Sequence, residues 1–231
     1  TDERELDFHF KSFGSGDFSA VPLGCILSME GADPITEIEE LEQWWNLGLR
    51  VIGPVHYGRN RYSHGTGTEG GLTELGRKLL DAMAELGFLL DVTHLADGAF
   101  AEALERFSGP ILASHHNCRS LVPGQRQLSD PQIRDLLERG SVIGVALDAW
   151  MLTPGWVRGR SRPEGVRIER AADHIDHICQ LAGHSGNVGI GSDLDGGFGT
   201  EQCPEDLDTI RDLQKIGEIL ENRGYRQREI E

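Results

Sequence analysis

The sequence lacks several features that would identify common classes of protein. It has no run of the roughly 20 apolar residues that a membrane-spanning helix needs. Basic residues are few: 22 Lys and Arg stand against 38 Asp and Glu, which gives a net charge of −16 at pH 7. Because a nucleic-acid backbone is bound by a basic surface, this balance argues against a nucleic-acid partner.

Cysteines are scarce, one catalytic motif is missing, and one dinucleotide-binding motif lacks the structural context that it needs. The four cysteines have no C-x-x-C spacing, so neither a disulfide scaffold nor a cysteine metal site is expected. No G-x-S-x-G occurs, which argues against a serine hydrolase. No predicted strand runs directly into a G-x-G-x-x-G that opens a helix, which disfavours an open dinucleotide-binding sheet. No signal peptide is visible; a cytoplasmic location is slightly favoured, with a targeting segment left open.

Short apolar runs alternate with amphipathic stretches, which is the pattern of βα units around a parallel sheet. The runs are nearly continuous in apolar character, as expected of strands buried on both faces. They lie at 22–29, 49–55, 87–92, 110–114, 141–147 and 187–192. Six such units are fewer than the eight of a closed barrel, so an open doubly wound sheet is the structural alternative.

The amphipathic stretches predict helices between these strands. Apolar residues recur at helical spacing at about 35–46, 74–86, 97–107, 130–139, 168–182 and 205–223. Ser129 and Gln132 have the spacing of a capping box at the start of one of them. We expect one domain over 1–231, with an irregular segment at 1–20, βα units at 21–200 and a C-terminal helical segment at 201–231.

Residues that can bind metal or move protons follow almost every predicted strand. They are Glu30, His56, His94, His115, Asp148 and Asp193. The carboxyl ends of the strands in a parallel barrel open onto one face, so these side chains should meet in one pocket. Imidazole suits zinc, and a carboxylate can bridge two metal ions that activate a water. The pattern therefore predicts a metal-dependent hydrolase.

Several segments resemble the membrane dipeptidase (renal dipeptidase) family of zinc metallopeptidases, in the manner of a bacterial-type member. The similarity runs in order from about residue 22 to 200 and is most specific at DVTH, SHxN and GSDLDG. The matching segments are EGADPI (30–35), LGLRVIGPVH (47–56), the stretch from GGLTEL to DVTH (70–94), ILASHHNCRSLVPGQRQLSD (111–130) and the stretch from DHIDHI to SDLDGG (173–197). The resemblance implies a (β/α)8 TIM barrel of the metal-dependent hydrolase type.

The resemblance also implies a role for each site residue. Glu30 matches the carboxylate that bridges two zinc ions, and His94 and His115 match the imidazole ligands of the second zinc. Asp193 matches a residue at the first zinc that takes the proton of the attacking water. His56 matches a histidine that binds substrate and stabilises the tetrahedral intermediate. Arg126 matches the arginine that holds the substrate's C-terminal carboxylate.

One departure from the family pattern concerns the first zinc. In the family the first barrel strand ends in a His-x-Asp pair, but no predicted strand of this chain does, and 1–20 contains only His9, in the reversed order Asp7-Phe8-His9. We therefore expect the first strand to be missing from this chain. Two zinc ions are expected in the intact protein and one in this chain, held by Glu30, His94 and His115.

Three functional interpretations follow from these residues. The first is hydrolysis of the amide bond of a dipeptide or related small amide. The second is another amidohydrolase-type barrel that acts on a lactone, a phosphoester or a deaminated base. The third is a non-catalytic barrel that has lost its first metal site. A small-molecule, dipeptide-like substrate is the expected partner, and a homodimer is left open.

Overall fold

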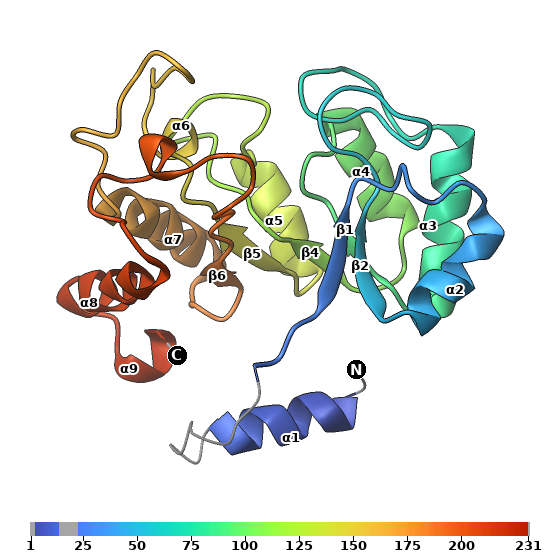
Figure 1. Ribbon diagram of the computed structural model, residues 1–231, viewed down its shortest axis with the longest axis horizontal. Coiled ribbons are helices and arrows are strands. Elements are labelled where there is room, and N and C mark those ends of the chain that lie inside the picture. The colour runs from blue at the N-terminus through green and yellow to red at the C-terminus, as the bar shows by residue number, and fades with distance from the viewer. Residues whose placement is uncertain (1–2, 14–22, 231) are drawn as a thin grey trace.

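The computed structural model describes residues 3–13 and 23–230. Its centre is a parallel sheet of six strands in which the spatial order follows the sequence order (Figure 1). The strands are β1 (Leu27–Glu30), β2 (Leu49–Gly53), β3 (Leu89–Asp91), β4 (Ile111–Ala113), β5 (Val142–Val145) and β6 (Val188–Ile190). Each falls within or at the end of a run that the sequence predicts, so the parallel α/β class is confirmed.

The two outer strands of the sheet have only one neighbour each among the described residues. The side chains of Ile26 and Leu27 next to the β1 edge and of Ile190 on β6 are about half exposed, at 54, 51 and 49%. The inner strands are buried, as a barrel sheet covered by helices requires. The described strands therefore form an open, barrel-like parallel sheet.

Helices follow the strands and cover the sheet. Figure 1 shows α2, α3 and α4 beside the β1–β2 end of the sheet and α7 and α8 beside β6. The helices are α1 (Glu3–Phe13), α2 (Leu41–Asn46), α3 (Glu74–Leu86), α4 (Asp97–Arg106), α5 (Asp130–Glu138), α6 (Ala149–Leu152), α7 (Glu169–Ala182), α8 (Gln214–Asn222) and α9 (Gln227–Ile230). Short 3-10 helices lie at Ile38–Glu40, Thr200–Gln202 and Ile210–Leu213. None of the described helices is long and apolar enough to cross a membrane.

Local signals in the sequence position two of these helices. The Thr73 side chain accepts a hydrogen bond from the N–H of Gly76 at the start of α3, and Gly87 ends that helix in the left-handed conformation, with φ 84°. The capping box of Ser129 and Gln132 is present at the start of α5. These caps confirm the predicted starts of α3 and α5, the helices that precede β3 and β5 in the chain.

The N-terminal segment differs from the prediction. Residues 3–13 form helix α1, whereas the sequence predicts an irregular or leftover segment over 1–20, of which 14–20 lie outside the described residues. The reason is local: these eleven residues contain neither glycine nor proline, and the glycines of the segment begin only at residue 14. Figure 1 shows α1 at the opposite end of the sheet from the long loops.

His174 also differs from its prediction. His174 and His177 stand three apart on the helix predicted at 168–182, and since that helix should lie on the outside of the barrel, the sequence predicts a solvated face for both; the structure instead buries His174, at 1% exposure. Its Nδ1 accepts the backbone N–H of Cys118 at 3.0 Å. His174 and Asp176 form a His-x-Asp sequence, but they lie in the middle of α7 rather than at the end of a strand.

Candidate metal centre

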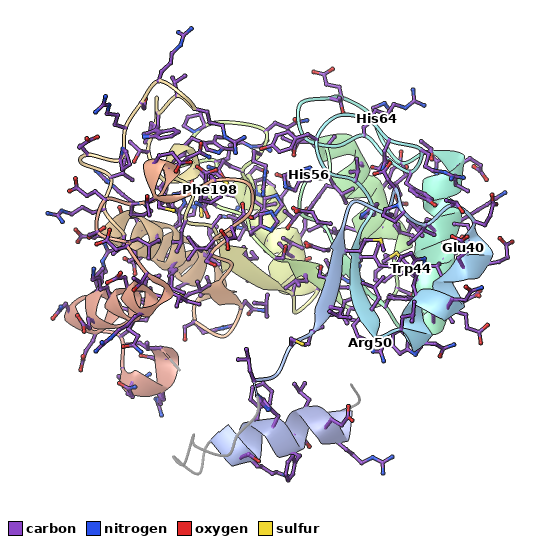
Figure 2. The ribbon with its side chains drawn as sticks, viewed as in Figure 1. Glu40, Trp44, Arg50, His56, His64 and Phe198 are labelled. Atoms are coloured by element: carbon purple, nitrogen blue, oxygen red, sulfur yellow. The ribbon has the colours of Figure 1, made fainter. Side chains whose placement is uncertain are left out.

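A cavity of about 180 Å³ lies at the carboxyl ends of the strands. All the side chains for which the sequence predicts a role line this cavity, although they are up to 163 positions apart in the chain (193 − 30). The lining residues are Glu30, His56, Tyr57, His94, His115, Arg126, Asp148, Trp150, Met151, Arg158, Asp193 and Gly196. Figure 2 shows His56 near the centre of the molecule, between the two halves of the sheet.

The carboxylate of Glu30 is the meeting point of three imidazoles. Its Oε1 lies 3.0 Å from Nε2 of His115, 3.1 Å from Nε2 of His94 and 3.9 Å from Nε2 of His56. Glu30 ends β1, and the three histidines follow β2, β3 and β4. Four neighbouring strands thus supply one ligand-type side chain each.

His115 is oriented by a buried carboxylate through a serine. Ser114 Oγ donates to Asp91 Oδ2 at 2.5 Å and lies 2.8 Å from Nδ1 of His115. Asp91 is 3% exposed and its Oδ1 accepts the backbone N–H groups of Thr93 and Ser114. Because the Ser114 hydroxyl gives its only hydrogen to Asp91, His115 must donate its Nδ1–H to Ser114. The lone pair of Nε2 is then left to face Glu30.

His94 is held in the same way by a threonine from the glycine-rich loop. Thr66 Oγ1 lies 2.9 Å from Nδ1 of His94 and donates to the His94 carbonyl at 3.4 Å. The Nδ1–H of His94 therefore points to Thr66, and its Nε2 also presents a lone pair to the cavity. Burial lowers the pKa of His94 to about 3, so the ring is neutral at pH 7.

This arrangement sets hydrogen-bond acceptors against one another. Two imidazole lone pairs and a carboxylate oxygen converge within 3.0 to 3.1 Å. Without a cation, each ring can donate a hydrogen bond to Glu30 only if its Nε2 carries a proton. Hydrogen bonds of this kind from His115 and His94 hold the pKa of Glu30 well below its usual range. A metal ion accepts all three lone pairs at once. The donor set therefore fits a metal.

His56 differs from the other two histidines. Together with Glu30 and His94 it forms the group whose ligand atoms lie within 4.8 Å of one another. Its side chain is 50% exposed, however, and no hydrogen bond to its Nδ1 is present among the described residues. Metal-binding histidines almost always donate the second ring N–H to a fixed partner. His94 and His115 meet that condition and His56 does not.

Asp193 and Arg126 complete the cavity wall. Burial raises the pKa of Asp193, while the nearby His115 opposes the shift. His94, Asp193 and Asp195 are the non-glycine residues with positive φ among those described, at 71°, 56° and 68°. Arg126 is 4% exposed; its Nη2 donates to the His115 carbonyl at 2.9 Å, and its Nη1 has no partner in the described protein. The unpaired nitrogen is a ready site for an anion.

Three residues of this centre, Asp91, Ser114 and Thr66, are not singled out by the sequence prediction. Asp91 and Ser114 stand within the DVTH and SHxN segments, directly before or near a predicted ligand. Thr66 is 28 positions from His94, in a loop tied down by bridges from Tyr57 to Thr66 and from Gly65 to Leu95. A hydroxyl or carboxylate next to a predicted ligand is a usable signal for the first two, but no local signal marks Thr66.

Comparison with known proteins decides the family. The model of the membrane dipeptidase family (peptidase family M19) matches residues 17–231. The chain belongs to the membrane dipeptidase family. It is 26% identical to Dipeptidase 3 of Mus musculus over 218 residues, which is 90% of this chain and 42% of the mouse protein. It is 28% identical over 214 residues to an uncharacterised Klebsiella pneumoniae protein encoded in the pqqA 5′ region, covering 89% of this chain and 76% of that protein.

Two solved metallopeptidase structures share the fold, and the second of them is described as a member of family M19. A metallopeptidase of Rhodobacter sphaeroides bound to a phosphinate mimic of the dipeptide L-Ala-D-Ala superimposes with a TM-score of 0.79 at 28% identity, over 94% of this chain and 62% of that one. A structure described as dipeptidase AC gives a TM-score of 0.77 at 27% identity, over 89% and 61%. The chain thus spans about three fifths of these solved structures and less than half of the mouse protein.

Proposed function

We propose that this protein is a zinc-dependent dipeptidase, which hydrolyses the amide bond of dipeptides or related small amides with a metal-activated water. The observation that carries the proposal is the convergence of Glu30 Oε1 with two imidazole nitrogens whose rings are already turned by Ser114 and Thr66. Membership in a metallopeptidase family supports a metal, and neutral imidazole with carboxylate is a ligand set that suits zinc.

Each residue of the cavity has a role in this proposal. Glu30, His94 and His115 would hold one zinc ion, and Glu30 with Asp193 would contribute to a second site in the intact protein. Bound zinc polarises an amide carbonyl and lowers the pKa of a water toward neutrality. Asp193 takes the proton of the attacking water and passes it to the leaving amine.

The substrate is positioned by His56 and Arg126. His56, half exposed on the cavity wall, donates to the oxygen that becomes negative as the carbonyl is attacked. Arg126 binds the C-terminal carboxylate with the guanidinium nitrogen that lacks a partner in the protein. The two groups therefore fix a dipeptide at its carbonyl and at its end.

Glu30→Gln in the intact protein tests the proposal, with Glu42→Gln on the exposed face of α2 as the matched control. We expect E30Q to lose zinc on dialysis and to lower the rate of dipeptide hydrolysis by more than about a hundredfold, beyond the effect of removing a residue that only supports a ligand. E42Q should retain both zinc and activity. Unchanged hydrolysis by E30Q would refute the role of Glu30.

A further inference from the structure

The cavity wall facing the histidines carries a second arginine. Arg158 belongs to the long connection between α6 and α7, and it lines the same cavity as Asp148, Trp150 and Met151. These residues follow β5, whereas Glu30 and the histidines follow β1 to β4. The segment after β5 therefore forms a part of the cavity wall separate from the segments that carry Glu30, His94 and His115.

Asp148 is the structural anchor of this wall. It is 2% exposed, and its Oδ2 accepts hydrogen bonds from Nε1 of Trp150 at 2.7 Å and Nε2 of Gln202 at 2.8 Å. Its Oδ1 accepts the backbone N–H of Trp150 at the start of α6. Asp148 is thus already satisfied by neutral donors, and it serves to hold the indole of Trp150 against the cavity.

Arg158, by contrast, is only loosely held by the protein. Its NH2 lies 3.5 Å from Oδ2 of Asp148, and its guanidinium carbon lies 5.6 Å from the centre of the Trp150 ring. The side chain is 48% exposed. No hydrogen bond from its Nε or NH1 occurs within the part of the chain that the structure describes. Arg158 therefore presents free donors and a positive charge to the cavity.

The charges around the cavity indicate what these donors would bind. Glu30, Asp148 and Asp193 all border it, so an acidic ligand needs cationic side chains to bind there. Arg126 can compensate for one carboxylate, which a dipeptide already supplies at its C-terminus. A second carboxylate in the same cavity needs a second cation, and guanidinium is the group best shaped for it.

We propose that Arg158 binds a carboxylate on a side chain of the substrate and so makes the enzyme selective for acidic dipeptides. Asp148 is a positioning residue in this scheme, because it orients the indole on which Arg158 rests. The inference rests on the proposed dipeptidase function and adds a substrate class to it.

The test compares isosteric substrates that differ in one charge. The values of kcat/KM are measured for Ala-Glu against Ala-Gln and for Glu-Ala against Gln-Ala with the intact zinc-loaded protein. The variants are Arg158→Gln, Arg158→Lys and, as a matched control on the same loop, Arg160→Gln, which is exposed and does not line the cavity. Equilibrium binding of the same dipeptides is measured by calorimetry in parallel.

We expect the wild type to prefer the Glu member of at least one pair by about fivefold, the upper range for a half-exposed ion pair. R158Q should bring that ratio close to one, R158K should keep part of it because the charge is retained, and R160Q should match the wild type. A ratio near one in the wild type, or an equal loss on both members in R158Q, would overturn the proposal.

The two hypotheses fail in different ways. If the wild type cleaves none of the four dipeptides, the dipeptidase function falls. The calorimetric preference for the acidic member, and its loss in R158Q, then still decides whether Arg158 recognises a carboxylate. If the dipeptides are cleaved without discrimination, only the role of Arg158 is refuted.

Discussion

At the scale of single residues, the candidate centre depends on the hydrogen bonds that orient the imidazole rings of its histidines. Ser114 passes its hydrogen to Asp91 and accepts the Nδ1–H of His115, so the chain from Asp91 through Ser114 sets which nitrogen of His115 is free. Thr66 does the same for His94.

Ser114→Ala removes one of these contacts without touching the cavity ligands. Loss of the hydroxyl frees the His115 ring and leaves Asp91 Oδ2 without its donor, so we expect zinc affinity to fall about 10- to 100-fold, the usual effect of removing a partner of a metal ligand. Competition with a chromogenic chelator measures the affinity. Ser108→Ala, at an exposed position after α4, is the control and should bind zinc as the wild type does; equal affinities in all three proteins would contradict the role of Ser114.

The same residues show how far a sequence leads at this scale. Strand-end position and family resemblance predict one shared site for six residues, and all six line one cavity in the structure. They are Glu30, His56, His94, His115, Arg126 and Asp193. The partners of the imidazoles were not predicted, because a hydrogen bond from Thr66 to His94 depends on the path of a loop rather than on any local pattern. The roles of all six stay predictions until the substitutions are made.

At the scale of secondary structure, close packing of strand ends shapes the floor of the centre. A Cβ built at Gly191, just after β6, would lie 1.9 Å from the carbonyl oxygen of Ser114 and 2.9 Å from the Cα of Gly144. Three successive strand ends therefore meet with no room for a methyl group. Strands were predicted from apolar runs, but this need for glycine emerges only once β4, β5 and β6 are side by side.

Gly191→Ala tests that packing, and Gly189→Ala, two residues earlier within β6, is the control. At Gly189 the new methyl would lie 3.6 Å from Cγ1 of Val142, an ordinary contact. We expect G191A to lower the free energy of unfolding by about 1–3 kcal/mol, as overpacking does, and to weaken zinc binding because the Ser114 backbone must move. G189A should change stability by less than about 1 kcal/mol. Urea unfolding and zinc titration give both readouts; equal behaviour of the two variants would argue against the tight floor.

At the scale of the whole molecule, the succession of strands and helices was predictable and the burial of side chains on the helices was not. The alternation of apolar runs gave the parallel sheet, since strand order follows chain order in successive βα units. His174 was predicted on a solvated face because its helix was expected on the outside of the barrel, but in the structure α7 packs there against Cys118 in the loop after β4. A contact between elements that are 56 residues apart decides its environment.

The burial of His174 makes the stability of the fold depend on pH. Burial lowers its pKa to about 4, with Asp173 opposing the shift, whereas an unfolded histidine titrates near 6.5. Below pH 6.5 the unfolded chain therefore gains a proton that the folded chain does not take until about pH 4. The contribution is fully present above pH 6.5 and is lost as pH falls from there toward 4; over that window it amounts to about 3 kcal/mol.

His174→Gln isolates this contribution, because the glutamine amide oxygen can still accept the N–H of Cys118 but cannot titrate. The free energy of unfolding is measured by urea denaturation at pH 7 and pH 4.5 for the wild type, H174Q and H184Q, the last an exposed histidine as control. Between the two pH values the wild type and H184Q should lose about 2–3 kcal/mol more than H174Q. An identical loss in all three proteins would mean that His174 takes up its proton equally readily in the folded and the unfolded state, and would contradict the lowered pKa.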